Sequence, residues 1–141
     1  IETNGTLPPS NDVCWSKRYW DRKGAYIVCS PKTGRINTIL EAAACCFKYV
    51  VTADSVYPED GLPVSALGHG ASPRVARVTK LYNRPVFVQP ADSKNDAENA
   101  ANLKCAIDSV REHGYTLQLQ IHKLINVEYF CMVVLLYFLL S

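Results

Sequence analysis

Apolar and polar residues follow two different periods along this chain, one typical of buried strands and one typical of helices. Short apolar runs at residues 25–29 and 85–89 are each followed closely by a proline and predict buried strands. Residues 47–52 are rich in β-branched and aromatic side chains and predict a third strand. Residues 115–121 alternate apolar with polar side chains and predict a fourth. Residues 1–6 have the pattern of a strand end that runs into a turn.

Two segments between these strands have helical patterns. Residues 37–44 combine helical spacing with good helix formers. Residues 95–113 predict the clearest helix, because Asn95 and Glu98 resemble a capping box and Gly114 is a typical stop. The apolar stripe expected to face the core consists of Leu103, Ile107 and Val110.

The order of these segments is strand, helix, strand, long loop, strand, helix, strand. Such alternation predicts an α/β fold with a parallel sheet and right-handed crossovers. The loop at residues 53–84 is rich in proline and glycine, and loops of this length are usually functional or mobile. In parallel sheets of this kind, ligands bind beyond the carboxyl ends of the strands.

Composition fits a globular chain and narrows the classes of function. The 141 residues include 15 Lys and Arg against 13 Asp and Glu, a formal net charge of +2 that does not favour a polyanion-binding protein. The chain has no recognisable signal peptide, so we expect a cytoplasmic protein with reduced thiols. No cysteines have CxxC or CxxxCxxC spacing, so a metal site built from this chain alone is not favoured. The six cysteines are Cys14, Cys29, Cys45, Cys46, Cys105 and Cys131.

Polar residues follow four of the predicted strands at their carboxyl ends. These segments are residues 2–5, 30–32, 89–92 and 120–123. A ring of such side chains suits a polar heterocycle that carries a carboxylate, because glutamine offers both a donor and an acceptor and lysine attracts an anion. The pattern alone leaves open which planar ligand would bind.

Six motifs in this order, IETNGT, CSPK, FKYVV, DGLP, FVQPAD and LQLQIHKL, resemble the C-terminal half of the 7-carboxy-7-deazaguanine synthase family. The resemblance covers residues 1–127. It implies a partial (β/α) barrel of the radical S-adenosylmethionine type, with the N-terminal half of the barrel missing from this chain, and a homodimer. It also implies S-adenosylmethionine, a 4Fe-4S cluster and Mg²⁺ as cofactors.

The activity implied by the resemblance is that of a carbon–nitrogen lyase. The family converts 6-carboxy-5,6,7,8-tetrahydropterin to 7-carboxy-7-deazaguanine by a radical ring contraction that releases ammonia. The product is a precursor of queuosine, a modified nucleoside of tRNA. No direct contact of this chain with nucleic acid is therefore expected, and the chain is expected to work without a membrane.

The resemblance also assigns candidate site residues. Cofactor contacts are implied for Gly5, Ser30, Pro31 and Lys32. Substrate contacts are implied for Thr3 and His122. The segment Gln89, Pro90, Ala91 and Asp92 would lie near the adenine or the substrate, and the sequence does not separate the two. The cluster motif CxxxCxxC and the magnesium ligand of the family are absent from the sequence, so no catalytic or metal residue is assigned. We expect the chain alone to be unable to cleave S-adenosylmethionine reductively.

Residues 128–141 form a separate apolar tail that the family lacks. Residues 129–140 are uncharged and almost wholly apolar, but a bilayer span needs about 20 residues. A buried strand or helix end, or an artefactual extension, is the favoured interpretation, and a membrane tether is the alternative.

Two other features have plain structural explanations. The basic and aromatic residues 17–23 are interpreted as a solvated loop rather than a nucleic-acid patch. Asp54, Glu59 and Asp60 lack the spacing of a metal site.

One interpretation of the whole chain is that it is half of an enzyme. The alternative is a non-catalytic remnant or interaction module that keeps the fold.

Overall fold

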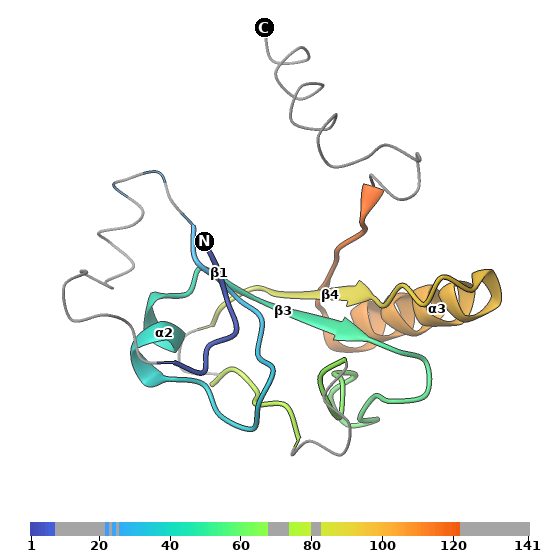
Figure 1. Cartoon of the computed structure of the whole chain (residues 1–141), viewed down its shortest axis with the longest axis horizontal. Coiled ribbons are helices and arrows are strands. Elements are labelled where there is room, and N and C mark those ends of the chain that lie inside the picture. Colours follow the sequence, from blue (N-terminus) through green and yellow to red (C-terminus); the bar gives the residue numbers. More distant parts are fainter. Residues whose placement is uncertain (8–21, 23, 25, 68–73, 80–82, 122–141) are drawn as a thin grey trace, which may run out of the picture.

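The computed structural model describes residues 1–7, 22, 24, 26–67, 74–79 and 83–121 (Figure 1). Within these residues it contains five strands and two helices. The strands are β1 (Glu2–Thr3), β2 (Val28–Cys29), β3 (Cys46–Val51), β4 (Val86–Pro90) and β5 (Thr116–Leu117). The helices are α2 (Thr38–Ala43) and α3 (Asp96–His113). The candidate residue His122, the loop at residues 17–21 and the tail at residues 128–141 lie outside the described residues.

All five strands are parallel, and each pairs with the next strand in the chain, in the order β1-β2-β3-β4-β5. The helix α2 connects β2 to β3, and α3 connects β4 to β5. A doubly wound sheet reverses its strand order at a switch point, whereas the wall of a (β/α) barrel runs in chain order as this sheet does. The predicted α/β fold with a parallel sheet is confirmed, although β2 and β5 are shorter than the patterns suggested.

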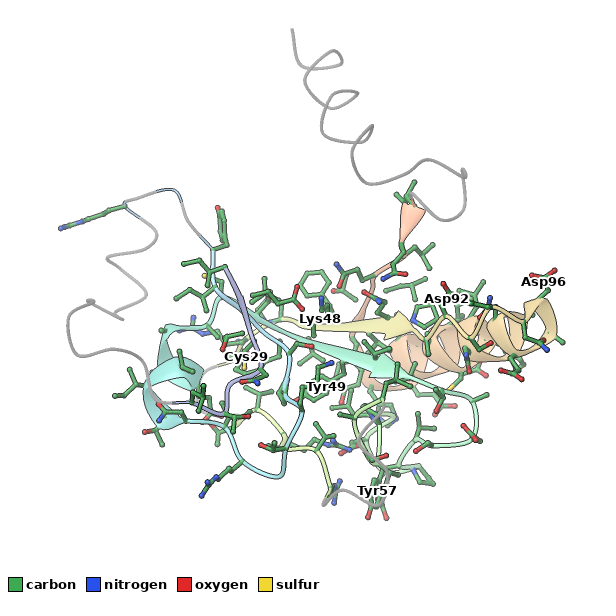
Figure 2. All side chains as sticks on the ribbon, in the orientation of Figure 1. Cys29, Lys48, Tyr49, Tyr57, Asp92 and Asp96 are labelled. Atoms are coloured by element: carbon green, nitrogen blue, oxygen red, sulfur yellow. The ribbon has the colours of Figure 1, made fainter. Side chains whose placement is uncertain are left out.

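The two faces of the sheet differ in what covers them. The side chains of Phe47, Tyr49 and Val51 are almost completely buried and form the core with Val88 and Ala106. We call this side, where α3 and the loop after β3 pack, the core face. Successive residues of a strand point to opposite faces and register partners share a face. Figure 2 accordingly shows Lys48 and Tyr49 extending to opposite sides of β3.

Helix α3 begins and ends where its local sequence predicts. The Asn95 side chain accepts hydrogen bonds from the backbone N–H groups of Ala97 and Glu98, at 3.0 and 3.1 Å. The backbone N–H of Asn95 donates to Ser93 Oγ at 3.4 Å, so the return bond of a capping box does not come from Glu98. Gly114 closes the helix in the left-handed conformation, with φ of 71°.

The buried side of α3 differs from the predicted apolar stripe. Its buried residues are Asn102, Ala106 and Ser109, while Ile107 is 37% exposed. Of the predicted stripe, Val110 packs against the core. Polar side chains occupy this side because they bond backbone groups of the sheet and of the loop after β3, as Asn102 does with the Ala53 N–H and the Ala91 carbonyl.

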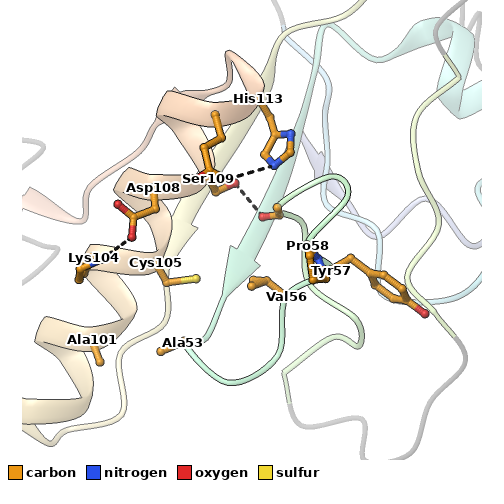
Figure 3. A pocket seen from close by; sticks show the side chains of 12 residues that line it. Ala53, Val56, Tyr57, Pro58, Ala101, Lys104, Cys105, Asp108, Ser109 and His113 are labelled. Atoms are coloured by element: carbon orange, nitrogen blue, oxygen red, sulfur yellow. Dashed lines mark hydrogen bonds and ion pairs between the residues drawn. The ribbon is translucent and has the colours of Figure 1, made fainter.

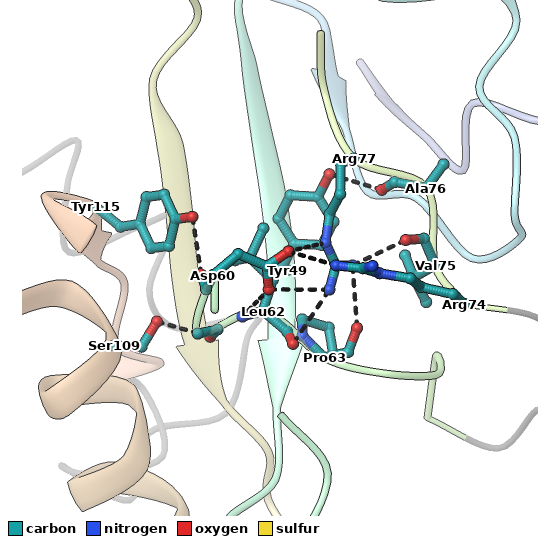
Figure 4. Close-up of polar contacts among 11 residues, drawn as sticks. Tyr49, Asp60, Leu62, Pro63, Arg74, Val75, Ala76, Arg77, Ser109 and Tyr115 are labelled. Carbon is teal, nitrogen blue, oxygen red and sulfur yellow. Dashed lines mark hydrogen bonds and ion pairs between the residues drawn. The ribbon is translucent and has the colours of Figure 1, made fainter. Parts of the chain in front are cut away.

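The loop after β3 was predicted to be functional or mobile, but its described parts are pinned over the core face. Asp60 accepts hydrogen bonds from the side chains of Arg74 and Arg77, at 2.9 and 2.7 Å (Figure 4). Burial alone would raise the pKa of the Asp60 carboxyl, but these hydrogen bonds and one from the Leu62 N–H outweigh it and hold the pKa below its usual value. Asp60 is therefore engaged in a structural ion pair.

Further contacts hold the same loop to the sheet. The Tyr49 hydroxyl donates to the Ala76 carbonyl at 2.9 Å, and Arg77 donates to the carbonyls of Pro63 and Val75 at 3.0 and 2.8 Å.

Within the part of the chain that the structure describes, no helix is both long and apolar enough to cross a membrane.

Candidate functional site

The carboxyl ends of the five parallel strands lie at one edge of the sheet. The register aligns Thr3 with Cys29, and Cys29 with Phe47. It also aligns Val51 with Pro90. The strand-end segments singled out in the sequence therefore share this edge, apart from the residues after 121. The register also shows on which face of the sheet each side chain lies. The sequence pattern alone did not show this.

Helices α2 and α3 lie on the core face, so the opposite face corresponds to the interior side of a barrel wall. We call it the inner face. Lys48 and Gln89 lie on it, because they alternate with the core residues Tyr49 and Val88. Ser30 belongs to the same face, one residue past Cys29 of the core.

Ser30 and Gln89 are the two candidate residues that the fold holds most firmly on the inner face. Ser30 is 3% exposed, its N–H donates to the Thr3 carbonyl at 2.7 Å, and its hydroxyl donates to the Lys48 carbonyl at 3.1 Å. Gln89 is 9% exposed, and the structure gives its side-chain amide no hydrogen-bond partner among the described residues. A nearly buried amide that lacks a partner is free to bind a ligand with both a donor and an acceptor.

An ion pair that the sequence reasoning missed lies on the same face. Lys48 Nζ is 2.6 Å from Glu2 Oε1, and the two side chains are 17% and 57% exposed. Glu2 belongs to the strand-end segment at residues 2–5, whereas Lys48 stands in the middle of β3 and was not singled out. The alternation of Cys46, Lys48 and Val50 with the apolar core positions of β3 was the signal that would have identified Lys48.

Thr3 and Gly5 are held differently from Ser30 and Gln89. The register puts Thr3 beside Cys29 on the core face, and Thr3 Oγ1 accepts a hydrogen bond from the Gly5 N–H at 3.2 Å. Gly5 has φ of 74°, and a Cβ atom there would lie 2.7 Å from Cys29 Sγ. The glycine is thus required for close packing of the turn against β2. Thr3 therefore lies on the core face, whereas Ser30 and Gln89 lie on the inner face. The strand-end side chains do not form the single ring that the sequence predicted.

The segment after β2 contains the other two residues assigned to the cofactor. Pro31 is buried, and Lys32 is partly exposed. Lys32 has no ion-pair partner within the described ranges, so its ammonium group is available to an anion.

The structure separates Gln89 from the residues that follow it. Pro90 pairs with Val51, a core residue, and therefore points away from the inner face. The Ala91 N–H donates to the Val51 carbonyl at 2.9 Å. Together with Asp92, these two residues line a groove of about 720 Å³ beside the first half of α3. Of the four residues from Gln89 to Asp92, Gln89 is the one on the inner face.

The described cysteines do not fit an iron–sulfur cluster. Burial, with a smaller contribution from Glu41, raises the pKa of the fully buried Cys29 thiol to about 12. Burial also raises the pKa of Cys46, with the neighbouring Cys45 adding to the shift. Cluster ligands are thiolates, and raised pKa values oppose that form. No group of three His, Cys, Asp or Glu residues among the described ones is placed to hold a metal ion.

A second pocket, of about 360 Å³, lies between α3 and the loop after β3, on the side away from the inner face (Figure 3). Three of its polar side chains have partners, whereas His113 Nε2 is buried without a hydrogen-bond partner and lies 3.9 Å from Glu112 Oε2. Ser109 Oγ donates to the Gly61 carbonyl at 2.7 Å, and Cys105 Sγ lies 3.8 Å from the Thr52 carbonyl. Asp108 pairs with Lys104 at 2.5 Å. These contacts tie the loop to the helix, and the pocket is not the candidate site.

Comparison with known proteins identifies two similar sequences, both named 7-carboxy-7-deazaguanine synthase. The one from Rhodospirillum rubrum is 35% identical over 133 residues, which cover 90% of this chain and 52% of the relative. The one from Rickettsia prowazekii is 30% identical over 137 residues, which cover 91% of this chain and 47% of the relative. The chain thus spans about half the length of these relatives. No family model and no solved structure matches. The resemblance inferred from the six motifs is confirmed.

Proposed function

We propose that this chain forms part of the barrel wall of a 7-carboxy-7-deazaguanine synthase and binds S-adenosylmethionine and a carboxylated pterin on its inner face. In this proposal the complete protein is a homodimer that contracts the ring of 6-carboxy-5,6,7,8-tetrahydropterin, releases ammonia, and serves queuosine biosynthesis. Similarity to two synthases over nine tenths of the chain supports the reaction class.

The observation that carries the proposal is the row of polar groups on the inner face of adjacent strands. Gln89 presents a nearly buried amide without a partner, and Lys48 presents an ammonium group held by Glu2. An amide matches the edge of a heterocycle, and an ammonium group attracts a carboxylate. Both S-adenosylmethionine and the pterin carry these two features, so the row suits either molecule.

The 4Fe-4S cluster and Mg²⁺ are assigned to the complete protein and not to the described residues. The described cysteines do not fit a cluster, because burial raises the pKa values of Cys29 and Cys46 and no cysteines have CxxxCxxC spacing. The contribution proposed for this chain is binding and orientation of the organic ligands.

Binding is tested by titrating the isotope-labelled chain with S-adenosylmethionine and following backbone amide signals by NMR. We expect saturable changes at residues 30–32, Lys48 and Gln89. The variant Lys48→Met should weaken binding about tenfold or more, since a charge-assisted hydrogen bond contributes about 1.5–3 kcal/mol. The variant Lys104→Met is the matched control, because that lysine lies on the opposite side of the molecule and its side chain is 78% exposed.

Two outcomes would contradict the proposal. One is the absence of any saturable change at the inner-face residues. The other is binding that Lys48→Met and Lys104→Met weaken equally, which would indicate a nonspecific charge effect.

The alternative function is a non-catalytic remnant or interaction module that keeps the fold. Anaerobic reconstitution with iron, sulfide and reductant separates the two. We expect the chain alone to produce no 5′-deoxyadenosine. Activity restored by adding a polypeptide that carries the cluster motif would favour the synthase, and binding without such activity would favour the module.

A further inference from the structure

Helix α3 has a second apolar side that the described residues leave uncovered. Leu103 and Ile107 are one helical turn apart on this side, and Ile107 is 37% exposed. After β5, Leu119 and Ile121 are 40% and 59% exposed. Large apolar side chains in such a row mark a surface that binds another apolar segment.

Part of this side forms the groove of about 720 Å³ at the carboxyl end of β4. Its apolar lining comes from Pro90, Ala91, Ala100, Leu103 and Leu119. Asp92, Lys94 and Asp96 also line it. Asp92 and Asp96 are exposed, so charged groups remain in water around an apolar floor. The groove is separate from the inner face, because α3 packs on the opposite side of the sheet.

We propose that this groove binds the chain's own apolar segment, residues 129–140. Leu119 and Gln120 line the groove, and the apolar segment begins nine residues after Gln120 in the sequence. Residues 122–128 connect the two and span at most about 25 Å when extended. The segment is thus tethered beside the groove.

The tether also favours this occupant over a second copy of the chain. A short flexible linker gives an effective concentration in the millimolar range, far above that of a second copy at micromolar protein. The segment carries no charge, so it meets the apolar floor without burying an unpaired ion. Each large apolar side chain that leaves water contributes about 1.5–3 kcal/mol. Docking would also fix the end of β4, one residue after Gln89.

The test is a photo-crosslink within the full chain at micromolar concentration. The amino acid p-benzoylphenylalanine replaces Ala100, which is exposed and lines the groove. The matched control carries it at Ala101, which is also exposed but lines the pocket between α3 and the loop after β3. After irradiation, proteolysis and mass spectrometry locate the crosslinked peptide. We expect an intramolecular crosslink from position 100 to residues 129–140, at least fivefold more abundant than from position 101.

Three results would overturn the proposal. They are equal crosslinking from both positions, a crosslink from position 100 to a second copy, and a crosslinked peptide outside residues 129–140. The variant Leu103→Asp should lower the yield from position 100 several-fold without changing the yield from position 101. If the chain binds phosphatidylcholine vesicles and loses that binding when residues 129–141 are deleted, the segment belongs to a membrane and the groove proposal fails.

Discussion

Replacing Asn102 by leucine should destabilise the fold strongly, although leucine has a similar size and is more apolar. Asn102 is 5% exposed, and its amide connects two strand ends. Its oxygen accepts from the Ala53 N–H at 2.8 Å, and its nitrogen donates to the Ala91 carbonyl at 3.1 Å. Asn102→Leu removes both bonds while filling the same space, so the loss reports on hydrogen bonding rather than on a cavity.

The magnitude follows from the burial of the two abandoned groups. The bond to the Ala91 carbonyl is buried, and leaving that oxygen without a partner costs about 1–3 kcal/mol. The bond from the Ala53 N–H is only partly buried and Ala53 itself is exposed, so water replaces it at a cost of about 0.5–1.5 kcal/mol. The sum is a loss of about 1.5–4.5 kcal/mol in the free energy of unfolding.

Urea denaturation followed by circular dichroism measures this loss. With a urea slope of about 2 kcal/mol per molar, the midpoint should fall by about 1–2 M. The control is Asn99→Leu, because Asn99 is on the same helix but bonds Ser93 and Asp92 at exposed positions, at 2.9 and 3.2 Å. That variant should lose less than about 1 kcal/mol. Equal midpoints for the two variants at unchanged slope would refute the reasoning.

Two further perturbations concern the loop after β3. Gly61→Ala should cost about 2–4 kcal/mol of unfolding free energy, because φ is 61° and the new Cβ would lie 2.5 Å from Ser109 Oγ. Gly114→Ala, also at positive φ but with no described atom within 4 Å, should cost only about 1 kcal/mol in the same denaturation assay; equal losses would contradict the close approach at Gly61. Arg77→Met should weaken the acid dependence of stability. The lowered pKa of Asp60 contributes stability above its unfolded value of about 3.9, and this stability is lost as pH falls through the folded value. The difference between wild type and variant should therefore shrink in pH-resolved melts as pH falls through the folded pKa of Asp60, down to the part due to the Arg77 bonds to the Pro63 and Val75 carbonyls. A constant difference at all pH values would exclude an electrostatic role.

The ends of α3 were predictable from sequence because caps are local. An asparagine before the first turn and a glycine after the last satisfy backbone groups within a few residues. The buried side of the same helix was not predictable in this way. Asn102 and Ser109 face inward because Ala53, Ala91 and Gly61, distant in sequence, present backbone groups there.

The candidate site shows the same division between local and distant information. The rule that ligands bind at strand carboxyl ends predicted one edge of the sheet, and the described strand-end segments do share an edge, since the parallel order follows from alternating strands and helices. It did not identify the face. Register puts Thr3 beside Cys29 and Pro90 beside Val51, on the core face. Lys48 was missed because it stands in the middle of a strand.

The polar inner face contributes little to the stability of the fold, and this bears on what the face is for. The Lys48–Glu2 pair has a carboxylate that is 57% exposed, and pairs of this kind contribute about 0–1 kcal/mol. An apolar residue at position 48 would stabilise a sheet face at least as well. Lys48→Met should therefore unfold within about 1 kcal/mol of wild type in urea. If that variant kept its fold but lost S-adenosylmethionine binding, the lysine would be explained by the ligand and not by packing. Unfolding of the variant would instead assign Lys48 to the structure of the sheet.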